Sequence, residues 1–178
     1  MHDELPDFKY HPDPIGTGSI EKSEKECLCC GAKRGYIYTA SVYSVLDLDD
    51  SICPWCIADG SAAKKFDASF TDDANLFNAG IPTAIILEVT SRTPGYISWQ
   101  SEYWESHCED ACEFHGDASK DDIKELDSEA ISKLSDNLGL DESVWKSFHK
   151  QYSAGGDPAI YKFKCRHCHK LIYNGDWS

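Results

Sequence analysis

The sequence lacks any hydrophobic run long enough to cross a lipid bilayer. Its longest apolar stretch, IPTAIILEV at residues 81–89, is less than half of the roughly 20 residues that a membrane-spanning helix needs. The opening MHDELPDFKYHP has neither the basic segment nor the apolar core of a signal peptide. Low-complexity tracts and internal repeats are also missing. We therefore expect a folded, soluble protein of the cytoplasm, and its 178 residues suit a single domain.

Positive charge is scarce as well. The chain has 17 Lys and Arg against 31 Asp and Glu, which gives a net charge of −14. Ten acidic residues lie between residues 102 and 127, where only Lys120 and Lys124 are basic. Such a face repels nucleic acid and attracts a basic protein, although a solvated surface that keeps the protein soluble explains it too. The residues expected to contact a basic partner are Glu102, Glu105, Glu109, Asp110, Glu113, Asp117, Asp121 and Asp122.

Cysteine, in contrast, is abundant, with nine residues. In the reducing cytoplasm, Cys-x-x-Cys pairs suggest metal binding before disulfides. Cys27 and Cys30 are followed, after 22 intervening residues, by Cys53 and Cys56, and this spacing resembles a four-cysteine zinc ribbon. Gly31 allows the turn that follows the first pair. We predict a zinc site at these four cysteines, with Cys29 pointing elsewhere or substituting for Cys27.

Four more cysteines can close a second site. Cys108 and Cys112 are spaced as on one helical face or across a turn, and Cys165 and Cys168 form a third Cys-x-x-Cys pair after 52 intervening residues. We therefore predict two zinc ions per chain, the second at Cys108, Cys112, Cys165 and Cys168. The alternative ligands are His107, His115, His167 and His169.

Three motifs suggest catalysis, and none is complete. CPWC at 53–56 resembles a thiol oxidoreductase motif, but another cysteine pair lies within ligand range. His107 and Glu109 satisfy the H-x-E of zinc deaminases, yet no P-C-x-x-C follows. A zinc ion held by four thiolates has no open position for water. We predict no catalytic residue and favour a non-enzymatic binding protein, with a zinc- or thiol-dependent enzyme or an adaptor as alternatives.

The pattern along the chain indicates an α+β domain stabilised by zinc. Strand-like residues fill 35–45, and a short helix with Ser61 as its N-cap follows Cys56. The segment at 81–95 favours a helix, and amphipathic helices follow Ser119 and Asp141. The expected parts are an extended arm (1–20), a zinc-ribbon-like part (21–70), a helical middle with the acidic face (71–157) and a C-terminal knuckle hairpin (158–178).

Several strings together resemble one family. They are CLCCGAKRGYIYTASVYS, ICPWCIADGSAAKKFDASF, RTPGYISWQSEYWESHCEDACEFHG, FKCRHCHKLIY and the opening LPDFKYHPDPIGTGSI. Taken in their order along the chain, they resemble the CbrC family of small bacterial proteins. Its name is associated with tolerance to nuclease-type colicins, so the resemblance implies an immunity-like protein that masks a basic toxin domain. It brings no catalytic residue. The eight paired cysteines carry over, as do the RTPG (92–95) and WQ (99–100) stretches, which form either a binding surface or a packed turn.

Overall fold

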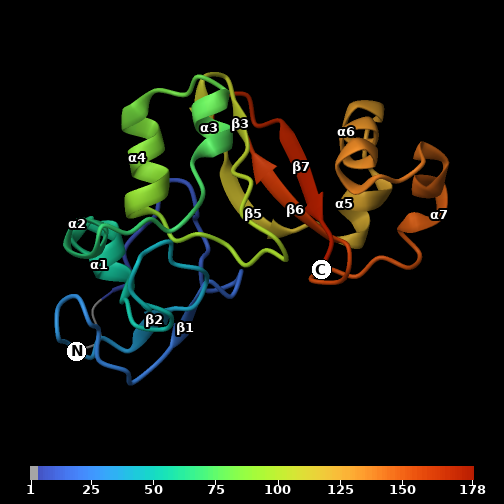
Figure 1. The fold of residues 1–178 in the computed structure, drawn as a ribbon. Coiled ribbons are helices and arrows are strands. Elements are labelled where there is room, and N and C mark those ends of the chain that lie inside the picture. Colours follow the sequence, from blue (N-terminus) through green and yellow to red (C-terminus); the bar gives the residue numbers. More distant parts are fainter. Residues whose placement is uncertain (1–3) are drawn as a thin grey trace.

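The computed structural model describes residues 4–178 as a mixed α+β fold, which confirms the predicted class (Figure 1). The elements are, in order, β1 (Ile20–Lys22), β2 (Tyr36–Tyr38), α1 (Pro54–Ala58), α2 (Ser61–Phe66), α3 (Ala74–Asn78), α4 (Thr83–Arg92), β3 (Ser106–His107), β4 (Asp110–Ala111), β5 (Glu113–Asp117), α5 (Lys120–Lys124), α6 (Ser128–Leu138), the 3-10 helix η1 (Glu142–Val144), α7 (Trp145–Phe148), β6 (Ala159–Lys164) and β7 (Leu171–Asp176). Within residues 4–178, none of the helices has both the length and the apolar character to cross a membrane.

The N-terminal part is built from very short elements. β1 pairs with β2 in an antiparallel ribbon, and α1 and α2 pack beside it (Figure 1). Tyr38, Ile57 and Phe70 are fully buried in its core. The sequence predicted a strand within 35–45, but the observed strand there, β2, is only three residues long. α2 does begin at Ser61, but its N-cap is the left-handed Gly60, so the predicted Ser61 cap is wrong.

The sequence suggested a helical middle for this chain, but the structure contains strands there as well as helices. After α3 and α4, residues 106–117 form the β3–β4 hairpin and the edge strand β5. In β5, Phe114 and Gly116 are buried whereas His115 and Asp117 are exposed, which is the alternation of a strand with one buried face. The polar residues of this five-residue strand already alternate with Phe114 and Gly116 in the sequence, although over so short a stretch the alternation is a weak signal.

An antiparallel sheet of order β5–β6–β7 occupies the centre of the molecule (Figure 1). Aromatic rings form its core: Tyr96 stacks on Phe114 at 4.3 Å between centroids, and Phe163 lies 5.3 Å from Phe114. The predicted C-terminal hairpin is confirmed, since β6 and β7 pair from Ala159↔Asp176 to Lys164↔Leu171. The Cys165–Cys168 segment therefore lies at the hairpin's turn.

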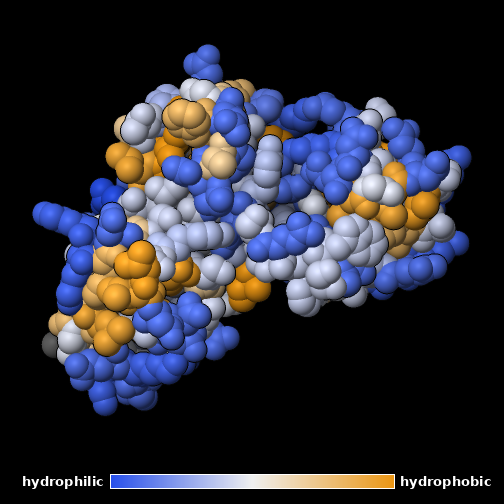
Figure 2. Space-filling view, viewed as in Figure 1, coloured by the Kyte–Doolittle hydropathy of each residue, from blue (hydrophilic) through white to orange (hydrophobic). Residues whose placement is uncertain are grey.

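Helices α5 to α7 form a separate cluster against the sheet (Figure 1). Ser119 caps α5 in a reciprocal capping box with Asp122, as predicted. Trp145 and Phe148 pack with ring centroids 4.7 Å apart, and Phe148 and Tyr152 with centroids 5.7 Å apart, so the three rings share one face. Figure 2 shows hydrophobic residues over this end and over the N-terminal part, with hydrophilic residues around them.

The N-terminal arm lies on the body; its residues 1–3 fall outside the described residues. Tyr10 and His11 are fully buried. His11 Nδ1 lies 2.9 Å from the carbonyl of Pro94, and burial lowers the pKa of the ring to about 4. A Cβ on Gly95 would lie 1.9 Å from the carbonyl oxygen of Phe70. The RTPG stretch is therefore the end of α4 followed by a tightly packed, buried segment rather than a turn.

The WQ stretch ties distant segments together. The Trp99 indole donates to the carbonyl of Gly156 at 3.1 Å, and the Gln100 amide donates to the carbonyl of Trp177 at 3.3 Å. These contacts bring the loop after RTPG against the ends of the C-terminal hairpin.

Candidate metal centres

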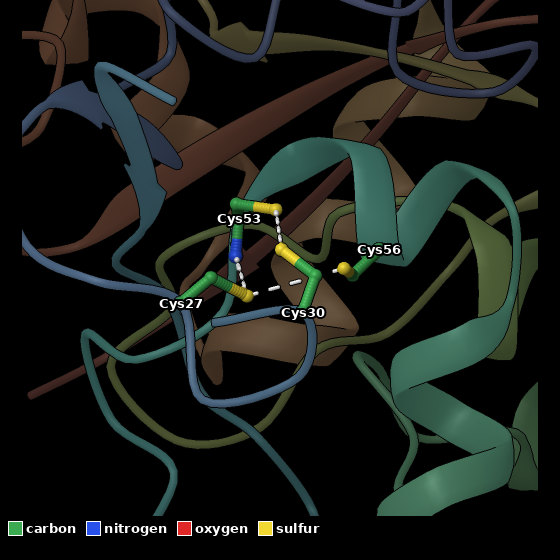
Figure 3. A group of neighbouring side chains, drawn as sticks. All are labelled: Cys27, Cys30, Cys53 and Cys56. Atoms are coloured by element: carbon green, nitrogen blue, oxygen red, sulfur yellow. Dashed lines mark hydrogen bonds between the residues drawn. The ribbon is translucent and has the colours of Figure 1, made fainter. Parts of the chain in front are cut away.

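The first cluster contains the four cysteines that the sequence predicts (Figure 3). Cys27 and Cys30 lie in the loop between β1 and β2, while Cys53 caps α1 and Cys56 lies within it. Their four Sγ atoms lie within 4.8 Å of one another, and the Cys27–Cys56 and Cys30–Cys53 separations are both 3.9 Å. A tetrahedral ion with metal–sulfur bonds of about 2.3 Å requires sulfur atoms about 3.8 Å apart. The cluster fits such an ion.

Backbone hydrogen bonds set the shape of this loop. The Cys27 N–H donates to the Ala32 carbonyl at 3.0 Å, and the Gly31 N–H donates to the Cys27 carbonyl at 2.7 Å. Gly31 has φ +70°, where glycine is unstrained. The Cys53 N–H points at Cys27 Sγ, 3.2 Å away. We call residues 27–32, with this pattern of backbone hydrogen bonds, the first knuckle.

Three of the thiols in this cluster differ in their pKa. The hydrogen bond from the Cys53 thiol, more than any other contact, lowers the pKa of Cys27 to about 4, and the same bond raises the pKa of Cys53. Burial raises the pKa of Cys56 to about 12. Cys27 is thus ready to ionise, whereas the other two need a cation nearby before they lose their protons.

The second cluster differs from the prediction in one ligand. It gathers His107, Cys108, Cys165 and Cys168, whose ligand atoms lie within 4.8 Å of one another. His107 Nδ1 is 3.1 Å from Cys108 Sγ and 3.4 Å from Cys168 Sγ. His107, weighed as an alternative ligand, stands where we expected Cys112.

The hairpin geometry explains this correction. A helical face would bring Cys108 and Cys112 together, but Cys108 and Glu109 form a tight left-handed turn, with φ of +53° and +60°. The turn places His107 opposite Asp110 and carries Cys112 past the hairpin into the core. Cys112 is fully buried, and burial raises its pKa to about 12. It is a core residue of the sheet.

Residues 165–170 form a second knuckle with the same pattern of backbone hydrogen bonds as the first. The Cys165 N–H donates to the Lys170 carbonyl at 2.9 Å, and the His169 N–H donates to the Cys165 carbonyl at 3.0 Å. Although burial raises the pKa of the Cys165 thiol, backbone hydrogen bonds from Cys168 and His167 lower it to about 6. His169, with φ +62°, occupies the position of Gly31 in the first knuckle.

Because His169 and Gly31 occupy equivalent left-handed positions, we expect two substitutions at these positions to have opposite effects on protein stability. A left-handed conformation costs a side chain roughly 1–2 kcal/mol. After allowing for the greater freedom of glycine when unfolded, His169→Gly should stabilise the protein by about 0.5 kcal/mol and leave its metal content unchanged. Gly31→His should destabilise it by a similar or larger amount. Thermal unfolding with metal analysis measures both; metal loss in His169→Gly would make His169 a ligand instead.

The other two alternative histidines have different partners. His167 Nε2 lies 3.0 Å from Asp110 Oδ2, and His115 Nε2 lies 3.1 Å from Glu113 Oε2. Cys29, the ninth cysteine, lies 3.5 Å from the Ser61 hydroxyl. Of the described histidines, His107 alone lies within a cluster of potential metal ligands.

The predicted acidic face is broken up by burial. Glu102, Glu105 and Asp110 are only 3 to 6% exposed, so these three predicted contact residues do not form part of an open acidic face. The Glu105 carboxylate pairs with Lys133 at 2.6 Å. Sequence shows where the carboxylates lie along the chain but not which of them the fold covers.

Asp110 instead supports the second knuckle. It accepts hydrogen bonds from the Tyr10 hydroxyl at 2.6 Å and from Arg166 at 3.1 Å. Burial raises the pKa of Asp110, but these bonds and the one to His167 outweigh it and lower the pKa. The arm is thereby tied to the knuckle.

The other predicted contact residues are accessible to different degrees. Glu109, Asp117 and Asp121 are exposed, while Glu113 and Asp122 are half-buried. Glu113 lies near Arg166, and Asp122 pairs with Lys162 at 3.0 Å. An acidic surface therefore remains, but it is smaller than predicted.

The fold and these clusters define a small α+β protein with two cysteine-rich sites that could each hold a metal ion. The chain belongs to the uncharacterised protein family UPF0167, whose model matches residues 5–177. It is 48% identical to the UPF0167 protein PA1536 of Pseudomonas aeruginosa over the full length of both chains. It is 40% identical to the UPF0167 protein Mb2317 of Mycobacterium bovis, over 98% of this chain and 94% of the relative. No solved structure matches.

Proposed function

We propose that this protein is a zinc-stabilised, non-enzymatic binding protein of the cytoplasm that neutralises a basic, nuclease-type bacterial toxin domain by occlusion. Four-coordinate sets of thiolates, with or without one imidazole, are the ligands of structural zinc sites. Both clusters have this composition.

The observation that carries the proposal is that each cluster supplies four ligands. Catalytic zinc sites keep three protein ligands and leave one position for water or substrate. A zinc ion held by Cys27, Cys30, Cys53 and Cys56 has no such position, and the same holds for the second cluster. The metal would then stabilise the fold, and the protein would act by binding a partner at its surface.

Charge and resemblance suggest the partner. The net charge of −14 favours a basic protein and speeds its encounter at low salt. The resemblance to the CbrC family points to toxins of the nuclease-colicin type. Glu109, Asp117 and Asp121 belong to the predicted acidic set and are exposed, and we choose Glu109 and Asp121 of these three for charge reversal.

Charge reversal tests this proposal. A panel of purified basic nuclease-toxin domains should include one that the protein binds and inhibits. Glu109→Lys with Asp121→Lys should weaken that binding about tenfold at low salt, mainly through slower association. Asp47→Lys with Asp49→Lys is the matched control, since both residues are exposed and the charge change is equal. Binding to no panel member, or equal weakening by both pairs, would contradict the proposal.

An enzyme with a zinc or thiol centre is the second candidate. One observation favours it: Cys108 and Cys168 of the second cluster are exposed. A reactive thiolate there would be alkylated rapidly even in the zinc-loaded protein. Slow alkylation until the zinc is removed supports the structural role instead.

A further inference from the structure

A cleft whose lining includes none of the cluster ligands has buried polar atoms without hydrogen-bond partners. It has a volume of about 510 Å³, beside the start of α3. Asp72, Asn75, Asn78, Ser101, Glu102 and Tyr103 supply its polar and aromatic lining. Among residues 4–178, no Lys, Arg or His lines it, and the charged groups at its wall are carboxylates.

Glu102 is the most unusual of these residues. Its side chain is buried, and one carboxylate oxygen, Oε2, accepts a hydrogen bond from the Tyr43 hydroxyl. The other oxygen, Oε1, has no hydrogen-bond partner within the part of the chain that the structure describes. Burial raises the pKa of Glu102; the hydrogen bond from Tyr43 offsets part of this rise, and the nearby carboxylate of Asp72 adds slightly to it. A buried carboxylate oxygen without a donor is costly and demands an explanation.

Asn75 presents a second acceptor without a partner. Its side-chain amide donates to the carbonyl of Trp104, which turns Oδ1 away from that bond. Oδ1 is buried and has no partner among residues 4–178. The carboxylate of Asp72 completes the set, with one oxygen accepting from the Ala74 N–H at 2.7 Å. The cleft thus offers several acceptors and lacks a cationic donor.

We propose that this cleft receives the guanidinium group of an arginine side chain from the basic protein partner. This inference rests on the proposed function and names the contact that its partner makes. Guanidinium carries five N–H donors and no acceptor, so one group can donate to several acceptors at once. Tyr103, 48% exposed, adds aromatic surface on which the planar group can pack.

The size of the cleft favours a side chain over a bare metal ion. Its volume of about 510 Å³ is in the range of pockets for small organic groups. Calcium sites, by comparison, surround the ion with six to eight oxygen atoms at about 2.3–2.6 Å. Among residues 4–178, three or more ligand groups come within 4.8 Å of one another in the two cysteine clusters and not in this cleft.

Acetyl-arginine-amide is a suitable probe, because it carries the guanidinium without the rest of a partner. We expect it to bind the zinc-loaded protein and to shift the NMR signals of the Asn75 side-chain amide. Acetyl-citrulline-amide has nearly the same shape without the charge and should bind at least tenfold more weakly. Calcium chloride is the third ligand and should cause no shift at Asn75.

Glu102→Gln should weaken arginine binding at least tenfold and also raise the melting temperature at neutral pH. Because its pKa is raised in the folded protein, Glu102 costs stability as the pH rises through that pKa and the carboxyl ionises. Glutamine removes this cost and still accepts from Tyr43. Asp73→Asn is the control: this exposed residue precedes α3, loses the same charge and does not line the cleft.

The outcomes separate this inference from the proposed function. Arginine binding that Glu102→Gln weakens and Asp73→Asn leaves unchanged supports the cleft, even if no toxin domain is bound. A shift caused by calcium and not by arginine, equal binding of citrulline, or equal weakening by both variants overturns it. A Glu102→Gln variant with a lower melting temperature and unchanged binding would give Glu102 a structural role.

Discussion

Removal of metal from the first cluster should unfold the N-terminal part of the molecule while the central sheet stays folded. β1 and β2 have three residues each, and α1 and α2 have five and six. A two-stranded ribbon and helices of this length are not stable on their own in water. Cys27, Cys53 and Cys56 are themselves members of the buried cluster around Tyr38 and Ile57. The ion would therefore hold both the loops and the core of this part.

The expected effect is large. Binding of zinc to four-ligand structural sites contributes about 10–16 kcal/mol in small zinc domains, which is comparable with the whole stability of an ordinary domain, about 5–15 kcal/mol. The central sheet has its own aromatic core, in which Tyr96, Phe114 and Phe163 pack together. It should outlast the N-terminal part.

Hydrogen exchange read by mass spectrometry measures this directly. On addition of a strong zinc chelator, or in Cys53→Ser, peptides from residues 20–70 should lose protection while peptides from 159–164 keep it. Cys29→Ser is the matched control, since Cys29 lies next to the cluster but outside its four ligands. Retained protection of residues 20–70 in metal-free protein would show that this part folds without the ion.

The first cluster was predictable because its geometry is local. A Cys-x-x-Cys turn followed by Gly31 places two thiolates on one side whatever the rest of the chain does, and a second such pair completes the tetrahedron. The capping of α5 by Ser119 was predictable for the same reason, since a capping box depends on four consecutive residues.

The second cluster was only partly predictable, because its ligands depend on the form of the backbone between them. Cys108 and Cys112 meet on a helix but part in a hairpin, and the polar–apolar alternation of the following strand spans only five residues. The exchange of Cys112 for His107 follows from this one misassigned element. Sequence spacing gives ligand positions only when the secondary structure between them is known.

Burial was the other limit of the sequence. Glu102, Glu105 and Asp110 look like surface residues in a run of carboxylates, yet the fold covers all three. Each has a different role: Asp110 supports a knuckle, Glu105 pairs with Lys133, and Glu102 keeps an unpartnered oxygen at a cleft. Charge counting found the acidic character of the protein, but tertiary packing decided which carboxylates a partner can reach.

Loss of His107 should empty the second metal site, whereas loss of Cys112 should not. His107 Nδ1 lies against two of the three thiols in this cluster, and Cys112 is buried in the sheet core. Replacement of residues that merely orient a metal ligand reduces affinity about 10- to 100-fold. Removal of the ligand itself in His107→Ala should therefore reduce metal affinity at this site by about 100-fold or more.

Cobalt substitution shows the ligands directly, because each thiolate adds to the sulfur-to-cobalt charge-transfer absorption. The clusters contain four and three thiolates, so the loaded protein should absorb as seven. Cys112→Ala should bind two cobalt ions with the same spectrum, and His107→Ala should bind only one tightly. His107→Cys should restore two ions and increase the absorption to that of eight thiolates. A spectrum of eight thiolates in the unmodified protein, decreasing to seven in Cys112→Ala, would return Cys112 to the site. The two knuckles would then have the same four-thiolate chemistry despite the hairpin between His107 and Asp110.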